Sequence, residues 1–358
     1  MIGGTLTHYF KTKYPDIIEI LAPSSKKMSL REPEDIKLYF QKYKPDFIIN
    51  AAIASIDSDP QLSYETNYLG TVRLAQVALE QGIPYIHISS AATMPMGANL
   101  TEEAHIPLTP GLSNYAKSKL MSEMTLEHLH RTRNLDYTVI RLAIVYGTHD
   151  HKIQGFHRLF FSIVNKSMLV MLTKPNVFHS YSNCSKLPLF IHHMLDRRDE
   201  FGGQTYNFVD RNPVNLSQLI MTIKSYLEVS FPKDIYLPYP LARMGKTVLG
   251  WLVWLLNRLG IESRMPAEVM FLEQFYQTQT LSAAKLESSS FEDPFPETTI
   301  YTALPDIIQY YLTRWEHLNL ISPYNKEFFD PKKRAEDFLR SPEDLLQEIH
   351  NGKLNVFD

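Results

Sequence analysis

The chain has 358 residues, of which 44% are hydrophobic and 21% are charged, as is usual for a folded globular protein. The 36 Lys and Arg and the 39 Asp and Glu give a formal net charge of −3, so the composition gives little support to nucleic-acid binding. The single cysteine, Cys184, excludes an internal disulfide and a metal site built from cysteines. Because the first residues lack the charged-then-apolar pattern of a secretion signal, we expect a cytoplasmic location.

The first four residues, Met1-Ile2-Gly3-Gly4, have the pattern that ends a glycine-rich strand-to-helix turn. In such turns the helix N-terminus receives the pyrophosphate of a dinucleotide. The strand and the first two glycines of the pattern do not precede these residues, a difference of about ten residues by usual strand lengths. We therefore expect a dinucleotide site that is incomplete, a weakly bound cofactor, and a gap in the sheet beside its second strand.

Short apolar runs alternate with helical patterns over the first 150 residues, which is typical of βαβ units. Strands are expected at 16–22, 46–50, 85–89 and 137–142, and helices at 33–43, 62–80 and 114–130. Continuous apolar strands are covered on both faces. We predict an α/β fold, with a Rossmann-like doubly wound parallel sheet in residues 1–150 whose first strand is missing.

The alternation weakens after Gly147. Strands are expected at 168–172, 205–209 and 234–237, and helices at 215–227, 248–259 and 305–318. We interpret residues 151–322 as a smaller α/β substrate-binding region. Residues 323–358 are charged and are predicted to be a solvated tail with a helical stretch at 331–348.

One apolar run, Val248 to Leu256, contains two tryptophans and is too short to span a bilayer. The favoured interpretation is a helix buried against the substrate-binding region or at a subunit contact. The alternative is a weak contact with a membrane surface through residues 246–260, because Lys246 and Arg258 flank the run and tryptophan favours that interface.

Tyr115 and Lys119 have the spacing that places a phenol and an ammonium on one helix face. The cation is expected to lower the pKa of the phenol, so that it can exchange a proton with a carbonyl or carbinol oxygen. Ser90 ends a predicted strand 25 positions before Tyr115, at the sheet edge where parallel folds bind ligands. Tyr9 and Lys13 have the same spacing but no such neighbour. We predict Ser90, Tyr115 and Lys119 as the catalytic group.

Together these motifs resemble the extended short-chain dehydrogenase/reductase superfamily, of the NAD(P)-dependent epimerase/dehydratase type. The resemblance covers residues 1 to about 147 and is carried by Met1–Gly4, Pro45–Ala52, Asn67–Thr71, His87–Ala91 and Arg141–Gly147, where Leu142 replaces the usual proline. It implies that Tyr115 is the general acid/base, that Lys119 holds the nicotinamide ribose, and that Ser90 orients the substrate oxygen.

The resemblance also implies a cofactor site. Its expected residues are Ile2, Gly3, Asn50, Ala51, Ala52, Asn67, Tyr115, Lys119 and Leu142. Asn67 would support Lys119. NADP is slightly favoured over NAD, because the loop from Ala22 to Lys27 has two cations and no carboxylate that would repel a 2′-phosphate. No metal site is expected, since the histidines are scattered.

Two subfamily similarities disagree. Residues 22–52 and 146–150 are similar to reductive sugar-nucleotide enzymes such as GDP-fucose synthase. If that similarity holds, His157 would be a second acid. Ala92, however, stands where GDP-fucose synthase has a cysteine, two positions after its catalytic serine. Residues 205–209, the Trp-rich run and residues 276–286 are similar to 3β-hydroxysteroid and sterol dehydrogenases.

Three functions follow, in order of preference. The first is an NAD(P)-dependent oxidoreductase for a secondary alcohol or ketone, and the second is a sugar-nucleotide epimerase or dehydratase that retains NAD. The third is a non-catalytic protein of the same fold, since fold alone does not fix function. The expected partners are a small molecule, either a sugar nucleotide or a steroid- or lipid-like ketone, and a second copy of the chain, because dimers are the commonest assembly.

Overall fold

The computed structural model describes residues 1–56, 58–149, 153, 155–165, 173–227, 236–261, 269, 272–318, 320–321 and 338–350. By its internal contacts the chain forms two compact units, residues 1–304 and residues 305–358. The predicted strand at 168–172 lies outside the described residues.

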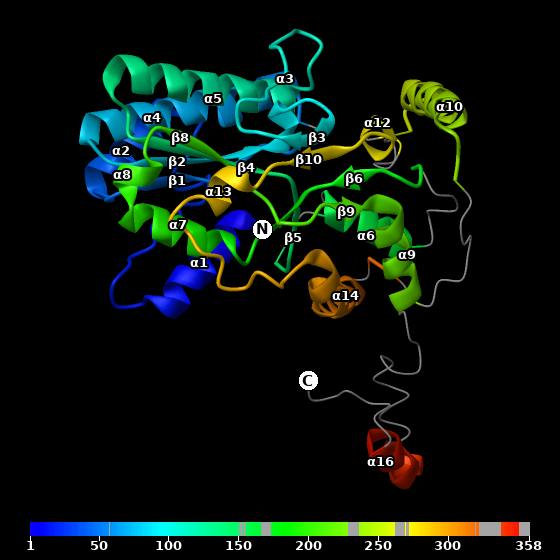
Figure 1. The fold of residues 1–358 in the computed structure, drawn as a ribbon. Coiled ribbons are helices and arrows are strands. Elements are labelled where there is room, and N and C mark those ends of the chain that lie inside the picture. The colour runs from blue at the N-terminus through cyan, green and yellow to red at the C-terminus, as the bar shows by residue number, and fades with distance from the viewer. Residues whose placement is uncertain are drawn as a thin grey trace. The chain divides into compact units, whose positions relative to one another are not determined.

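The first unit is built on a four-stranded, wholly parallel sheet (Figure 1). Its strands, in spatial order, are β1 (Ile48–Asn50), β2 (Tyr85–Ser90), β4 (Tyr137–Leu142) and β8 (Gln204–Phe208). Every residue of β4 is buried, as expected for a strand covered on both faces. The predicted Rossmann-like α/β sheet is thereby confirmed.

Helices cover both faces of this sheet (Figure 1). On one face lie α2 (Pro33–Lys42), α4 (Gly70–Gln81) and α5 (Asn114–Arg133), and on the other lie α1 (Ile2–Lys13) and α7 (Leu187–Asp196), with α8 (Arg198–Phe201) following α7. Alternate strand residues enter separate hydrophobic clusters: Val139 packs with Leu74 of α4, and Ile140 packs with Phe190 of α7. The period of two along a strand produces this division.

The predicted strand at 16–22 is wrong. The segment forms a turn followed by irregular chain, and β1 is the edge of the sheet. A strand requires a hydrogen-bonded neighbour, and among the described residues β1 pairs only with β2. Ile18 and Ile20 still pack against the hydrophobic cluster on the α1 side of the sheet. The apolar pattern of this segment therefore indicates burial but not strand pairing.

The predicted helix at 62–80 is present in three successive pieces. They are α3 (Pro60–Ser63), a π-helical segment (Tyr64–Leu69) and α4, which ends at Gly82 in the left-handed conformation with φ 65°. Asp59 begins the helical stretch, because its side chain accepts a hydrogen bond from the Leu62 amide at 2.9 Å.

The remaining elements of the first unit form two small sheets and several helices. A mixed sheet has the order β3 (Gly97–Leu100), β10 (Gln279–Leu281), β6 (Phe178–His179) and β9 (Val214–Asn215), and a parallel pair joins β5 (Ile144–Tyr146) to β7 (Tyr181–Asn183). The helices are α6 (Phe156–Val164), α9 (Leu216–Tyr226), α10 (Tyr239–Arg258), α12 (Leu272–Phe275) and α13 (Ala284–Glu287). The expected strand at 205–209 and helix at 215–227 are confirmed to within about one residue. Of the strand predicted at 234–237, the described residues form only a single bridge at Tyr236.

The exposure of helix α10 contradicts one part of the favoured interpretation, a helix buried against the substrate-binding region, while the other part, burial at a subunit contact, stays a prediction. Val248, Trp251 and Trp254 are 60%, 62% and 53% exposed, and the only buried residue of the helix is Ala242. Hydropathy predicts the helix but not what covers it. No helix of the described residues is long and apolar enough to cross a membrane.

Helix α14 (Ile300–His317) begins five residues earlier than predicted, so that Pro305 lies inside it. Helix α16 (Pro342–His350) falls in the predicted helical stretch of the tail, much of which lies outside the described residues.

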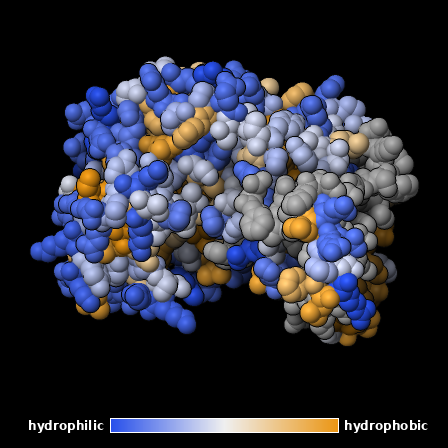
Figure 2. Space-filling view, turned by 90° about the horizontal axis from the view of Figure 1, so that it is seen from below, coloured by the Kyte–Doolittle hydropathy of each residue, from blue (hydrophilic) through white to orange (hydrophobic). Residues whose placement is uncertain are grey.

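Figure 2 shows the face of the chain that carries α1 and α7, where the hydrophobic residues form small separate spots within a mostly hydrophilic surface.

Candidate functional site

Ser90 lies at the carboxyl end of β2, beside Leu142 on β4. It also begins the short 3₁₀ turn Ala91–Thr93, because its Oγ accepts a hydrogen bond from the Ala92 amide at 3.2 Å. The strand end and the turn fix the position of this hydroxyl at the edge where open parallel sheets bind ligands.

Tyr115 and Lys119 come from the first turns of α5, which Ser113 caps through a bond from the Ala116 amide at 3.2 Å. The half-buried Tyr115 side chain interacts with the Ser90 side chain through a hydrogen bond. Lys119 is buried, and its Nζ donates to the Ile88 carbonyl of β2 at 2.7 Å. The structure therefore brings together the three residues predicted as catalytic.

Burial determines the protonation of this group. It raises the pKa of Tyr115, as does the Glu123 carboxylate more weakly, while the Ser90 hydrogen bond opposes the shift. Burial also lowers the pKa of Lys119 to about 8, opposed by Glu123. The expected lowering of the phenol pKa by Lys119 is wrong for this structure, because loss of solvation is the largest effect on Tyr115 and the charge that acts on it, the Glu123 carboxylate, raises the pKa as well.

A buried ion pair lies under the site and was not predicted. Arg141 Nη2 is 2.8 Å from Glu123 Oε2, and Arg141 Nη1 donates to the Glu102 carbonyl at 2.6 Å. The Ser89 hydroxyl also donates to Glu123. The sequence does contain a sign of this pair, an arginine inside the apolar run Tyr137–Leu142, since a buried cation requires a partner.

His87 is fully buried on β2, and neither of its ring nitrogens has a hydrogen-bond partner among the described residues. Burial, assisted by the charge of Lys119, lowers the pKa of His87 well below its usual value. The ring stacks 6.3 Å from that of Tyr85. His87 is therefore a neutral packing residue.

Two asparagines shape the turns beside β1. Asn50 Oδ1 accepts from the Ala52 amide at 3.2 Å, and its Nδ2 donates to the Tyr85 hydroxyl at 2.8 Å. Asn67 Oδ1 accepts from the Ala54 amide at 2.8 Å, and its Nδ2 donates to Ser118 Oγ at 3.3 Å. Asn67 thus joins the turn after β1 to α5 one residue before Lys119, and its hydrogen bonds do not include Lys119 itself.

The residues expected to hold a dinucleotide are compatible with one. Ile2 and Ala51 pack against the cluster that contains Leu142, which places the N-terminus of α1 near the strand ends. No side chain caps α1, and a Cβ added to Gly3 would meet no atom within 4 Å. Open space at uncapped helix amides suits a pyrophosphate. Lys119 would hold the ribose, because its ammonium has further N–H donors besides the one that bonds the Ile88 carbonyl.

His157 is fully buried at the start of α6, and its Nε2 lies 2.8 Å from the Gly147 carbonyl. It packs as an interior histidine, and its use as a second acid stays a prediction.

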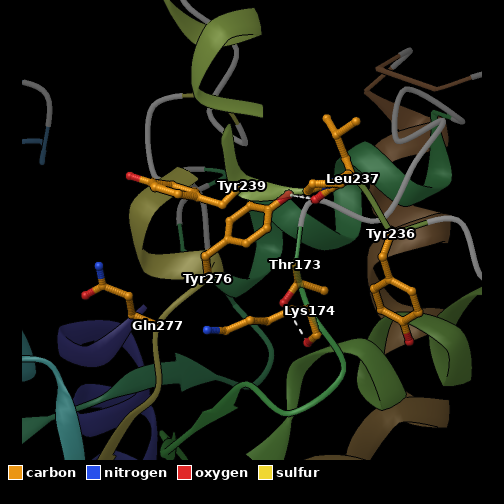
Figure 3. Close-up of a pocket in the computed structure, with 8 residues that line it drawn as sticks. Thr173, Lys174, Tyr236, Leu237, Tyr239, Tyr276 and Gln277 are labelled. Carbon is orange, nitrogen blue, oxygen red and sulfur yellow. Dashed lines mark hydrogen bonds between the residues drawn. The ribbon is translucent and has the colours of Figure 1, made fainter. Parts of the chain in front are cut away.

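A cavity of about 420 Å³ opens at the base of α10 (Figure 3). Its lining residues are Thr173, Lys174, Tyr236, Leu237, Pro238, Tyr239, Tyr276 and Gln277. Gln279 follows the lining residue Gln277 by two positions, and its Nε2 donates to the carbonyls of Ala91 and Pro95, each at 3.1 Å. The cavity is thereby joined through β10 to the loop that follows Ser90. No sequence pattern predicts this connection, since only the fold brings residues 91 and 279 together.

A Rossmann-type sheet with a serine, a tyrosine and a lysine at the carboxyl end of its strands defines a dinucleotide-dependent enzyme of the extended short-chain dehydrogenase/reductase class. The profile of the NAD dependent epimerase/dehydratase family matches residues 1–180, half of the chain, and the chain belongs to that family. Members of this class depend on NAD or NADP.

Among curated relatives, the N-acetyl-alpha-D-glucosaminyl-diphospho-ditrans,octacis-undecaprenol 4-epimerase of Escherichia coli O157:H7 is 25% identical over 256 residues, which are 71% of this chain and 73% of the relative. The GDP-L-colitose synthase of Yersinia pseudotuberculosis is 24% identical over 48% of this chain and 59% of the relative. A UDP-glucose 4-epimerase from Thermotoga maritima has a similar fold, with a TM-score of 0.63 at 16% identity, covering 88% of this chain and 96% of that one.

Proposed function

We propose that the chain epimerises a sugar linked to a diphosphate, using a dinucleotide that is regenerated in each turnover. The observation that carries this proposal is the group of Ser90, Tyr115 and Lys119 at the carboxyl end of β2. The match over 71% of the chain to a relative named as a 4-epimerase supports epimerisation over the simple oxidation of an alcohol, which the sequence motifs alone favour.

The roles follow from the geometry. The bound dinucleotide would supply hydride acceptance and return. Tyr115 would exchange a proton with the sugar oxygen through its hydroxyl, Ser90 would donate a hydrogen bond to the same oxygen, and Lys119 would hold the ribose. Oxidation of the sugar requires the Tyr115 phenolate to accept the proton of the sugar hydroxyl, and reduction requires the phenol to return it. The raised pKa of Tyr115 favours the phenol, the form that returns the proton.

The test uses UDP-glucose and UDP-N-acetylglucosamine as probes, with NAD present in small amounts. Conversion detected by NMR without net formation of reduced nicotinamide supports epimerisation. Tyr115→Phe should lower turnover by about 10²–10⁴-fold. Tyr9→Phe is the matched control, because Tyr9 has the same spacing to a lysine but lies on α1, and it should retain activity. Turnover by Tyr115→Phe at the wild-type rate would refute the assignment.

Reduction of a keto-sugar is the second candidate. It is favoured by the loop from Ala22 to Lys27, which has two exposed lysines and no carboxylate. Stoichiometric consumption of NADPH with a keto-sugar, without epimerisation of the two probes, would establish it. Turnover of neither kind, with no nucleotide binding, would support the non-catalytic alternative.

A further inference from the structure

Helix α10 presents an apolar stripe to the outside of the chain. The stripe consists of Leu241, Met244, Val248, Trp251 and Leu252, followed by Leu259 directly after the helix, with exposed fractions between 44% and 67%. At 3.6 residues per turn these positions fall within an arc of about 100°. The stripe is therefore a continuous face of the helix.

The body of the chain holds α10 by the opposite side and mainly near its start. Ala242 packs with Leu272 and Tyr276, and Lys246 Nζ is 3.0 Å from a Glu273 carboxylate oxygen on α12. Beyond Lys246 no described residue of the helix is buried. Figure 1 shows α10 projecting at the margin of the first unit, away from the main sheet. A continuous row of exposed apolar side chains on an outward-facing helix indicates an interaction site.

The charges of the helix are all positive. α10 contains Arg243, Lys246 and Arg258 and no acidic residue. Arg258 lies 5.3 Å from the centre of the Trp254 ring, which is itself half exposed. Exposed tryptophans with arginines beside them are the composition of helices that lie in a lipid headgroup region.

We propose that α10 docks on the surface of an anionic lipid bilayer, with its apolar stripe below the headgroups and Arg243 and Arg258 at the phosphates. Charge complementarity selects this occupant. In a symmetric contact between two copies of α10, the same arginines would face each other, whereas an anionic surface neutralises them. The proposal goes beyond the proposed function and does not depend on it.

The test measures binding of the full chain to vesicles of phosphatidylcholine alone and with phosphatidylglycerol. The chain should float with the anionic vesicles, and its tryptophan emission should shift to the blue. Trp251 and Trp254 are exposed and the third tryptophan, Trp315, is 1% exposed, so the shift reports on α10.

Trp251→Ser with Leu252→Ser should weaken binding to anionic vesicles by about ten-fold or more. Arg243→Glu with Arg258→Glu should remove the preference for phosphatidylglycerol. Ile17→Ser with Leu38→Ser is the matched control, because these residues, in the turn after α1 and on α2, are 82% and 61% exposed, and it should bind as the wild type does. Circular dichroism verifies that each variant is folded.

Three results would overturn the proposal. They are no binding of the wild type to either vesicle, equal binding by the Trp251/Leu252 variant, and a dimer in light scattering that this variant dissociates. None of these measurements uses enzymatic turnover, so the proposed function can fail or stand independently of them.

Discussion

Among the residues of the site, Lys119 should make the free energy of unfolding depend on pH. Its pKa is about 8 in the folded protein, against 10.5 as the ordinary value. Between these values the unfolded chain binds more protons at this position than the folded protein, so the contribution of Lys119 to stability rises with pH. From pH 8 to pH 10 the increase should be about 2 kcal/mol.

Urea unfolding of the wild type and Lys119→Met between pH 8 and pH 10 measures this difference. The wild type should gain about 2 kcal/mol relative to the variant. Lys117→Met is the control on the same helix, since the Lys117 ammonium bonds the Pro110 carbonyl at the surface, and it should follow the wild type. Parallel pH profiles for the wild type and Lys119→Met would contradict the depressed pKa.

The Glu123–Arg141 pair makes a second prediction at this scale. Both side chains are less than 10% exposed. Glu123→Ala leaves the Arg141 guanidinium buried without its carboxylate, which should cost about 3–5 kcal/mol in the free energy of unfolding. The control is Glu65→Ala, whose partner Arg31 is 48% exposed, and its effect on the free energy of unfolding should be much smaller than that of Glu123→Ala. Equal losses in the two variants would show that burial does not distinguish the pairs.

The same residues show how far sequence reasoning reaches. Tyr115 and Lys119 are one helix turn apart, which is a local pattern, and Ser90 ends a strand at the sheet edge where parallel folds bind ligands. No such pattern relates Arg141 to its partner Glu123, which lies 18 residues earlier on another element. The raised pKa of Tyr115 also depends on how completely the fold excludes water from it.

Among the secondary-structure elements, α4 and α10 contain glycines with opposite expected effects. Gly82 ends α4 with φ 65°, a conformation that strains any residue with a Cβ, while Gly245 lies within α10. A Cβ would meet no atom within 4 Å at either position. Gly82→Ala should therefore destabilise the protein by about 1 kcal/mol, and Gly245→Ala should stabilise α10 by about 0.5–1 kcal/mol where local unfolding is measured.

Urea unfolding and amide exchange across α10 measure these two changes. Gly111→Ala is the control, since this glycine also has open space around it and its φ is not positive. Equal effects at Gly82 and Gly111 would show that backbone conformation does not control the end of α4.

Secondary-structure elements were predictable where the pattern itself determines the structure. The helix at 114–130 and the strands at 85–89 and 137–142 formed close to their expected bounds. The segment 16–22 has a strand-like composition, but pairing depends on a neighbour elsewhere in the chain. The apolar run of α10 likewise predicts a helix, whereas its exposure depends on what the fold places against it.

For the whole molecule, binding of the dinucleotide should stabilise the folded state. At a ligand concentration about 100 times the dissociation constant the gain is about 2.7 kcal/mol, which should raise the melting temperature by several degrees. Gly3→Val should reduce this shift, because its side chain would fill the open space at the N-terminus of α1. The melting temperature without nucleotide should change little, since no atom within 4 Å has to move. Gly111→Val, in an equally open position of a loop, should keep the full shift, and thermal unfolding with NAD and with NADP measures each case. A full nucleotide-dependent shift in Gly3→Val would place the pyrophosphate away from α1.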